Sequence, residues 1–181
     1  MTILHIDSSV LGENSVSRRL TRTVVDGLLS ADPGQPVHYR DLAAEPLPHF
    51  VPGGEAATLD EFLAADTVVI GAPMYNFSIP SQLKAWIDSI LVAGRTFRYT
   101  ENGPEGLAGP KRVIVVISRG GLYGAGTPGA SAEHVETYLR TIFAFIGLSP
   151  EFVIAEGLQL GPDARAASID RALGEIAALA A

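Results

Sequence analysis

The sequence predicts one α/β domain in which a doubly wound parallel sheet of five strands carries helices on both faces. The first observation is that short apolar runs alternate with segments of helical periodicity five times along the 181 residues. The second is that runs such as Val113 to Ile117 are apolar at every position, as expected for strands buried on both faces. Because no repeat or linker interrupts this pattern, a single domain over residues 1–181 is expected.

The first half of the chain contains three of these strands, at residues 3–6, 37–41 and 67–71. A helix is expected at residues 15–31, where apolar side chains recur at helical spacing until Asp32-Pro33-Gly34 ends the pattern. A short helix is predicted at residues 58–64. It follows an irregular segment that contains Pro46, Pro48, Pro52, Gly53 and Gly54.

The second half begins with a helix from Ser81 that ends before Gly94. The segment of residues 96–111 is too long for a plain connection between a helix and a strand. Phe97 and Tyr99 alternate before Asn102-Gly103-Pro104, a turn signal, so the segment is predicted to leave the main sheet and return through a turn. Strands are then expected at residues 113–117 and 152–155, with helices at residues 131–146 and 163–181.

Composition excludes several classes of function. Thirteen basic and 20 acidic residues give a net charge of −7, without a basic run, so nucleic acid is not an expected partner. The absence of cysteine excludes disulfides and thiol chemistry. No apolar run approaches the ~18 residues that span a membrane, and the N-terminus lacks the features of a signal peptide, so we expect a cytoplasmic protein.

Three loops follow the carboxyl ends of predicted strands, where open parallel sheets bind ligands. The loop after the first strand offers Ser9, Ser15 and Ser17, the last two at the start of a helix whose N–H groups suit a phosphate. Hydroxyl and N–H donors would bind such an anion in an acidic protein without a basic patch. The alternative is that Ser15 or Ser17 only caps the helix.

In the loop after the third strand, Ala72 to Phe77, Pro73 is expected to take no part in a ladder. This loop places Met74, Tyr75 and Phe77 where loops normally carry small polar residues. These side chains either contact a flat apolar ligand or fold back as a plug. Asn76 and the backbone amides would bond the polar edge of a ring. After the fourth strand, the glycines of Ser118-Arg119-Gly120-Gly121 allow close approach of a ligand, and Arg119 either meets a carbonyl or is solvated. Together the loops describe a monophosphate, a flat ring and no metal, which is the shape of riboflavin phosphate.

The chain closely resembles the FMN-dependent NADH azoreductases, also called FMN-dependent NADH:quinone oxidoreductases. The resemblance extends in order over nearly the whole chain, and it rests on Ser9, Ser15-Val16-Ser17, Pro73 to Phe77, Gly94 to Pro104 and Ser118 to Gly121. It implies a flavodoxin-like fold and a homodimer with active sites at its interface. It also implies that FMN is bound by Ser9, Ser15, Val16, Ser17, Met74, Tyr75, Asn76, Phe77, Ser118, Arg119, Gly120 and Gly121. The segment from Tyr123 to Ala130 is more glycine-rich than the family pattern.

The expected reaction is hydride transfer from NADH to FMN, followed by two-electron reduction of quinones or azo compounds. The cofactor supplies the chemistry, so no titrating side chain is expected to be indispensable. Phe77, Phe97 and Tyr123 are candidates for stacking, and N–H groups of Asn76, Gly120 and Gly121 are candidates for stabilising charge on the ring. No basic residue is assigned to a nicotinamide 2′-phosphate, so the residues do not decide between NADH and NADPH. They do not identify the electron acceptor either.

Several competing interpretations have weaker support. Gly124 to Gly129 fits G-x-G-x-x-G but follows the fourth strand and lacks a second half-domain. The four histidines lack metal-ligand spacing. A flavodoxin-type one-electron carrier is the main alternative, although the insert at residues 96–111 suits a pocket wall or a dimer contact. A receiver-like signalling domain would need an acidic cluster, for which Asp7 alone is a poor match.

Overall fold

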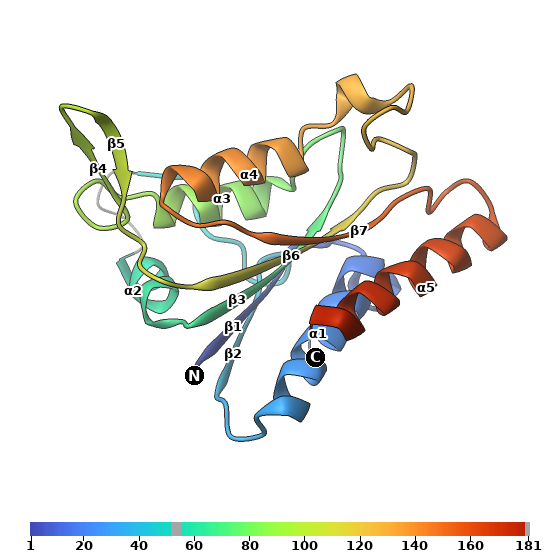
Figure 1. Ribbon diagram of the computed structural model, residues 1–181, viewed down its shortest axis with the longest axis horizontal. Coiled ribbons are helices and arrows are strands. Elements are labelled where there is room, and N and C mark those ends of the chain that lie inside the picture. The colour runs from blue at the N-terminus through green and yellow to red at the C-terminus, as the bar shows by residue number, and fades with distance from the viewer. Residues whose placement is uncertain (52–55, 180–181) are drawn as a thin grey trace.

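The computed structural model describes residues 1–51 and 56–179 and confirms the predicted architecture (Figure 1). Its main sheet has five parallel strands in the order β2-β1-β3-β6-β7, and a two-stranded antiparallel hairpin stands apart. The strands are β1 (Ile3–Asp7), β2 (Val37–Asp41), β3 (Thr67–Pro73), β4 (Phe97–Thr100), β5 (Gly103–Gly106), β6 (Arg112–Ser118) and β7 (Glu151–Ala155). The helices are α1 (Val16–Ala31), α2 (Ala56–Ala64), α3 (Ser81–Ile90), α4 (Glu136–Phe145) and α5 (Pro162–Leu179).

Each predicted strand and helix is found within a few residues of its expected place. The helix predicted at residues 131–146 is divided into a 3-10 turn, Ala130–Ala132, and α4, and α3 already ends at Ile90. Pro52, Gly53 and Gly54 of the predicted irregular segment lie outside the described residues, as do the last two residues of the final helix.

Helices cover both faces of the main sheet, which explains why its central strands are apolar at every position. Figure 1 shows α1 and α5 side by side on one face and α3 and α4 on the other. Within β3, Val69 belongs to the cluster under α1 and α5, whereas Val68 and Ile70 belong to the cluster with Trp86 of α3. Because successive side chains point to opposite faces, both apolar layers need residues from the same strand.

The third strand is longer than predicted, because Ala72 and Pro73 continue it beyond Gly71. The expectation that Pro73 takes no part in a ladder is wrong: Pro73 is the register partner of Ser118 in β6. The N–H of Met74 donates to the Ser118 carbonyl at 2.8 Å. Since successive N–H groups alternate in direction, residue 73 would point its N–H toward β1, whose pairing with β3 ends at Gly71. The missing proline N–H therefore interrupts no bond.

The predicted excursion at residues 96–111 contains the β4–β5 hairpin, whose turn lies at Glu101 and Asn102. The hairpin packs on the C-terminal end of α4, where the rings of Phe97 and Phe145 lie 4.6 Å apart. Figure 1 shows this hairpin at the end of the molecule away from the loops that follow β6 and β7. None of the helices in the described ranges is long and apolar enough to cross a membrane.

Candidate cofactor site

A pocket opens at the carboxyl edge of the main sheet, where the loops after β1, β3, β6 and β7 meet. The neighbouring strands β1 and β3 lead to helices on opposite faces, which produces a crevice between their ends. The lining residues are Ser9, Leu11, Asn14, Ser15, Val16, Pro73, Met74, Tyr75, Ser118, Arg119, Gly120, Leu158, Gln159 and Arg165. The three loops singled out from sequence are thus brought together. The fourth loop, which follows β7, was not predicted from the sequence, although it also follows the end of a strand.

Serine residues and free backbone N–H groups line the α1 side of this pocket. Ser15 is the N-cap of α1, since its hydroxyl accepts a hydrogen bond from the Arg18 N–H at 3.3 Å. The Ser17 hydroxyl is buried and lies 3.0 Å from that of Ser15, so it supports the cap from beneath. The N–H groups of Val16 and Ser17 have no intrahelical acceptor. Val16 lines the pocket, where its N–H suits an anion, whereas Ser17 is fully buried and is not among the lining residues.

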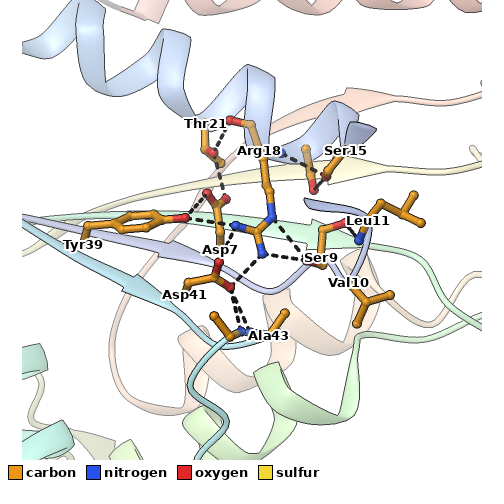
Figure 2. A network of polar contacts seen from close by, with 12 residues as sticks. Asp7, Ser9, Val10, Leu11, Ser15, Arg18, Thr21, Tyr39, Asp41 and Ala43 are labelled. Atoms are coloured by element: carbon orange, nitrogen blue, oxygen red, sulfur yellow. Dashed lines mark hydrogen bonds and ion pairs between the residues drawn. The ribbon is translucent and has the colours of Figure 1, made fainter. Parts of the chain in front are cut away.

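A network centred on Arg18 fixes the loop after β1 (Figure 2). The guanidinium donates to the Ser9 carbonyl at 3.2 and 2.7 Å, and to both carboxylate oxygens of Asp41 at 2.6 and 2.7 Å. The hydrogen bond from Arg18 lowers the pKa of Asp41, and the same bond raises the pKa of Arg18. Arg18 is therefore neutralised by Asp41 and acts by positioning Ser9. Sequence reasoning missed this pair, because Asp41 reaches Arg18 only through the pairing of β2 with β1.

Asp7, at the end of β1, is buried and held by neutral donors. It accepts hydrogen bonds from the hydroxyls of Thr21 at 2.9 Å and Tyr39 at 3.2 Å (Figure 2), and His5 Nε2 lies 3.5 Å away. Burial lowers the pKa of His5, whereas burial and the charge of Asp7 raise the pKa of Tyr39 to about 12. With 3% of its surface exposed and a hydroxyl bound to each carboxylate oxygen, Asp7 is a poor phosphoryl acceptor, which argues against a receiver-like domain.

The stretch after β3 forms a tight turn at the mouth of the pocket. Tyr75 and Ser78 exchange backbone hydrogen bonds of 2.9 and 3.1 Å. Asn76 and Phe77 between them both have positive φ, at 49° and 71°, as in a type I′ turn. The Tyr75 hydroxyl lies 3.0 Å from Ser9 Oγ and accepts from the Val10 N–H at 3.2 Å. Tyr75 thus folds back, as a plug would, whereas Phe77 stays half exposed.

Two of the three stacking candidates lie together, and the third does not. The rings of Phe77 and Tyr123 meet edge to face with centroids 6.2 Å apart, and the His134 N–H donates to the Phe77 carbonyl at 3.2 Å. This pair forms an aromatic wall near the turn after β3. None of the three candidates is among the residues that line the pocket, but Phe77 and Tyr123 lie on the loops that form it, whereas Phe97 packs on Phe145 in the hairpin. A role for Phe97 at this pocket in the same chain has no support from the geometry.

Arg119 is buried beneath the glycine-rich loop and surrounded by carboxylates. Its guanidinium lies 3.2 Å from Glu133, 3.1 Å from Glu136 and 3.5 Å from Glu156. Burial favours a raised pKa for Glu133, but hydrogen bonds from three backbone N–H groups and the charge of Arg119 lower it below its usual value. Glu156 also accepts from the N–H groups of Tyr123 and Gly124. These contacts hold residues 119–124 in one conformation.

The donors around the pocket fit the polar end of a flavin phosphate. The Arg119 side chain is 1% exposed, and its Nε is a buried donor without a partner among the described residues, so a ligand would satisfy it. The role predicted for Arg119 therefore rests on this one N–H. The pocket has about 110 Å³ of room, less than the ~300 Å³ or more of sites that enclose a whole drug-sized ligand. A phosphate ester fits inside, and a flat ring would lie across the outer loops.

Comparison with known proteins agrees with this geometry. A family model described as a flavodoxin-like fold matches residues 1–180. An FMN-dependent NADH:quinone oxidoreductase of Methylorubrum populi is 56% identical over an alignment of 203 positions that covers all of both chains. A second, from Bradyrhizobium diazoefficiens, is 57% identical over 96% of each chain.

Solved structures give the same result. The azoreductase AzrA is similar with a TM-score of 0.89 and 31% identity over 99% of each chain. An FMN-dependent NADH-azoreductase of Bacillus anthracis in complex with FMN has a TM-score of 0.87 and 25% identity, over 99% of this chain and 98% of its own. The fold, the site and these relatives lead to one conclusion: the chain belongs to the flavodoxin-like family, among the FMN-dependent NADH:quinone oxidoreductases.

Proposed function

We propose that this protein is an FMN-dependent oxidoreductase that transfers two electrons from NADH to quinones and azo compounds. The observation that carries the proposal is the convergence of four loops at the β1/β3 crevice, with phosphate donors inside and an aromatic wall outside. Related proteins named for NADH:quinone oxidoreductase and azoreductase activities support it. In this proposal, residues 1–181 form a single FMN-binding domain.

The side chains and backbone of the site bind and orient, since FMN, when bound, supplies hydride acceptance and electron transfer. The N–H of Val16 and the hydroxyl of Ser15, supported by that of Ser17, would hold the phosphate, with Ser9 kept in place by Arg18. The backbone of Met74 to Phe77 and of Ser118 to Gly121 would bond the edges of the ring. The aromatic wall of Phe77 and Tyr123 would shield the ring from water and contact the substrate.

The proposal includes a cytoplasmic homodimer that needs neither nucleic acid nor a membrane. The half-exposed Phe77 and the exposed Tyr99 are apolar surface that a second copy would cover. Phe97 retains a role in stacking only if its hairpin reaches the site of a partner subunit. NADH, the proposed reductant, is supplied in the cytoplasm. Sedimentation of the purified protein tests the dimer, and a monomer at micromolar concentration would contradict it.

Binding of FMN should raise the stability of the folded protein, because the loops that form the site come together only on folding. At a free concentration of about 100 times the dissociation constant, FMN should add ~2.7 kcal/mol to the free energy of unfolding. For a protein of this size that corresponds to roughly 5 to 10 °C in the unfolding midpoint. Thermal unfolding with and without FMN measures the shift, with adenosine monophosphate as the matched control. An unchanged midpoint with FMN would remove the basis for a flavin site.

The reaction should follow ping-pong kinetics. One face of a ring that lies across the loops would be covered by Met74 to Phe77 and Gly120, so NADH and the quinone must use the same open face in turn. The oxidised nicotinamide therefore has to leave before the quinone binds. Initial rates at several fixed quinone concentrations should give parallel double-reciprocal lines. Intersecting lines would indicate a second binding surface, and NADH consumption that needs a protein acceptor would indicate the one-electron carrier.

A further inference from the structure

One part of the pocket wall is built by the segment after β7, which contributes Leu158, Gln159 and Arg165. Its conformation is fixed by backbone bonds to the glycine-rich loop, since the Gly157 N–H donates to Gly121 at 2.8 Å and the Gln159 N–H donates to Gly120 at 2.9 Å. Arg165 lies in the first turn of α5, where its N–H donates to the Gly161 carbonyl at 3.0 Å. Its backbone position is therefore set by the fold.

Arg165 differs from the other arginines near the pocket in having a free charge. The guanidinium of Arg119 is surrounded by three glutamates, and Arg18 is paired with Asp41 and does not line the pocket. Arg165 is exposed and takes part in no ion pair with any described residue. Among the described residues that line the pocket, it is thus the cation available to a ligand.

A phosphate monoester in this pocket would need such a charge. It carries about −1.5 to −2 at pH 7, inside a protein whose net charge is −7. The start of α1 offers N–H groups and hydroxyls, which are neutral donors and balance only part of this charge. A guanidinium adds a full positive charge and two parallel N–H donors that match two phosphate oxygens.

We propose that Arg165 binds the phosphate of FMN together with the N-terminus of α1 and thereby makes the protein prefer FMN to riboflavin. The inference rests on the proposed function, because it assigns one more residue to the same cofactor. It departs from the expectation from sequence that neutral donors hold the phosphate without a basic patch.

Titration of the flavin-free protein with FMN and with riboflavin, followed by quenching of flavin fluorescence, tests this assignment. Arg165→Ala should weaken FMN binding about tenfold, the lower end for a hydrogen bond to a charged group, because Arg165 is exposed. Riboflavin binding should be unchanged. Arg165→Lys should lose less FMN affinity than Arg165→Ala, and Arg165→Glu should lose more. The control Arg171→Ala, on the same helix and also exposed, should bind both flavins as the unmodified protein does.

Salt gives a second measure, since screening weakens an exposed ion pair. FMN affinity should fall more steeply with salt in the unmodified protein than in Arg165→Ala. Equal losses of FMN and riboflavin affinity in Arg165→Ala would make Arg165 a structural residue only and overturn the assignment. Unchanged affinities would overturn it as well. In both cases FMN binding by the unmodified protein would leave the proposed function intact, whereas failure of the unmodified protein to bind FMN would remove both.

Discussion

Replacing Arg119 by methionine should lower the free energy of unfolding by about 3 to 5 kcal/mol, the usual loss when one partner of a buried ion pair is removed. The side chain of Arg119 is 1% exposed, and the substitution leaves Glu133, Glu136 and Glu156 facing one another without their shared cation. For a chain of this length the unfolding midpoint should fall by roughly 6 to 20 °C. Urea and thermal unfolding at pH 7 measure the loss.

The matched control is Arg171→Met, because the guanidinium of Arg171 is exposed and lies 4.0 Å from Glu175. Its unfolding midpoint should hardly change. The loss in Arg119→Met should also shrink as the pH falls below about 4.5, the usual pKa of a glutamate. The charge of Arg119 helps to lower the pKa of Glu133 in the folded state, and this contribution to stability is present above the usual pKa and disappears as Glu133 is protonated. A loss at pH 7 as small as that of Arg171→Met would show that the glutamates are not stabilised by Arg119.

Gly106→Ala should destabilise the protein by about 3 kcal/mol, the upper part of the range for overpacking. A Cβ on Gly106 would lie 2.1 Å from both the Gly147 nitrogen and the Ile146 carbonyl carbon. These are backbone atoms at the end of α4, so no side-chain rotation relieves the clash. Gly106 does not have a positive φ, and the expected effect is therefore steric. Denaturant unfolding gives the magnitude.

The hairpin should also detach from α4 in this variant, which a rise in proteolysis near residues 97–106 would detect. Gly174→Ala is the control, and it should change the free energy of unfolding in the opposite direction. Gly174 lies in α5 with nothing within 4 Å of an added Cβ, so alanine should stabilise by roughly 0.5 to 1 kcal/mol through its higher helix propensity. If Gly106→Ala has a free energy of unfolding as high as that of Gly174→Ala, the close contact between the hairpin and α4 does not exist in solution.

The sequence predicts the sheet and its helices well because both signals are local. Alternating apolar runs and helical periodicities determine which segments pair and which cover a face, and the ligand edge follows from the topology of parallel sheets. The extension of β3 through Pro73 was missed because the rule against proline in central strands assumes a neighbour on both sides. At Pro73 the pairing with β1 has already ended.

The side-chain networks of the site are not local, which is why they escaped prediction. Arg119 meets glutamates that are 14 to 37 positions distant in the chain, and nothing in the glycine-rich motif indicates its burial. Arg18 and Asp41 are brought together only by the pairing of β1 with β2. Arg165 has no motif around it, but the rule that strand ends line the ligand crevice, applied to β7, would have led to the segment between β7 and the first turn of α5.

The turn at Asn76 and Phe77 bears on how this protein can evolve. Two consecutive residues with positive φ other than glycine cost stability, about 1 to 2 kcal/mol for a residue such as Phe77, and less for asparagine. Selection for thermal stability alone would therefore favour glycine at both positions. It would also remove the amide of Asn76 and the ring of Phe77, which this turn carries next to the residues that line the pocket. Under selection for activity, Asn76 and Phe77 persist at the expense of stability, and descendants that lose the activity should be the first to acquire glycine there.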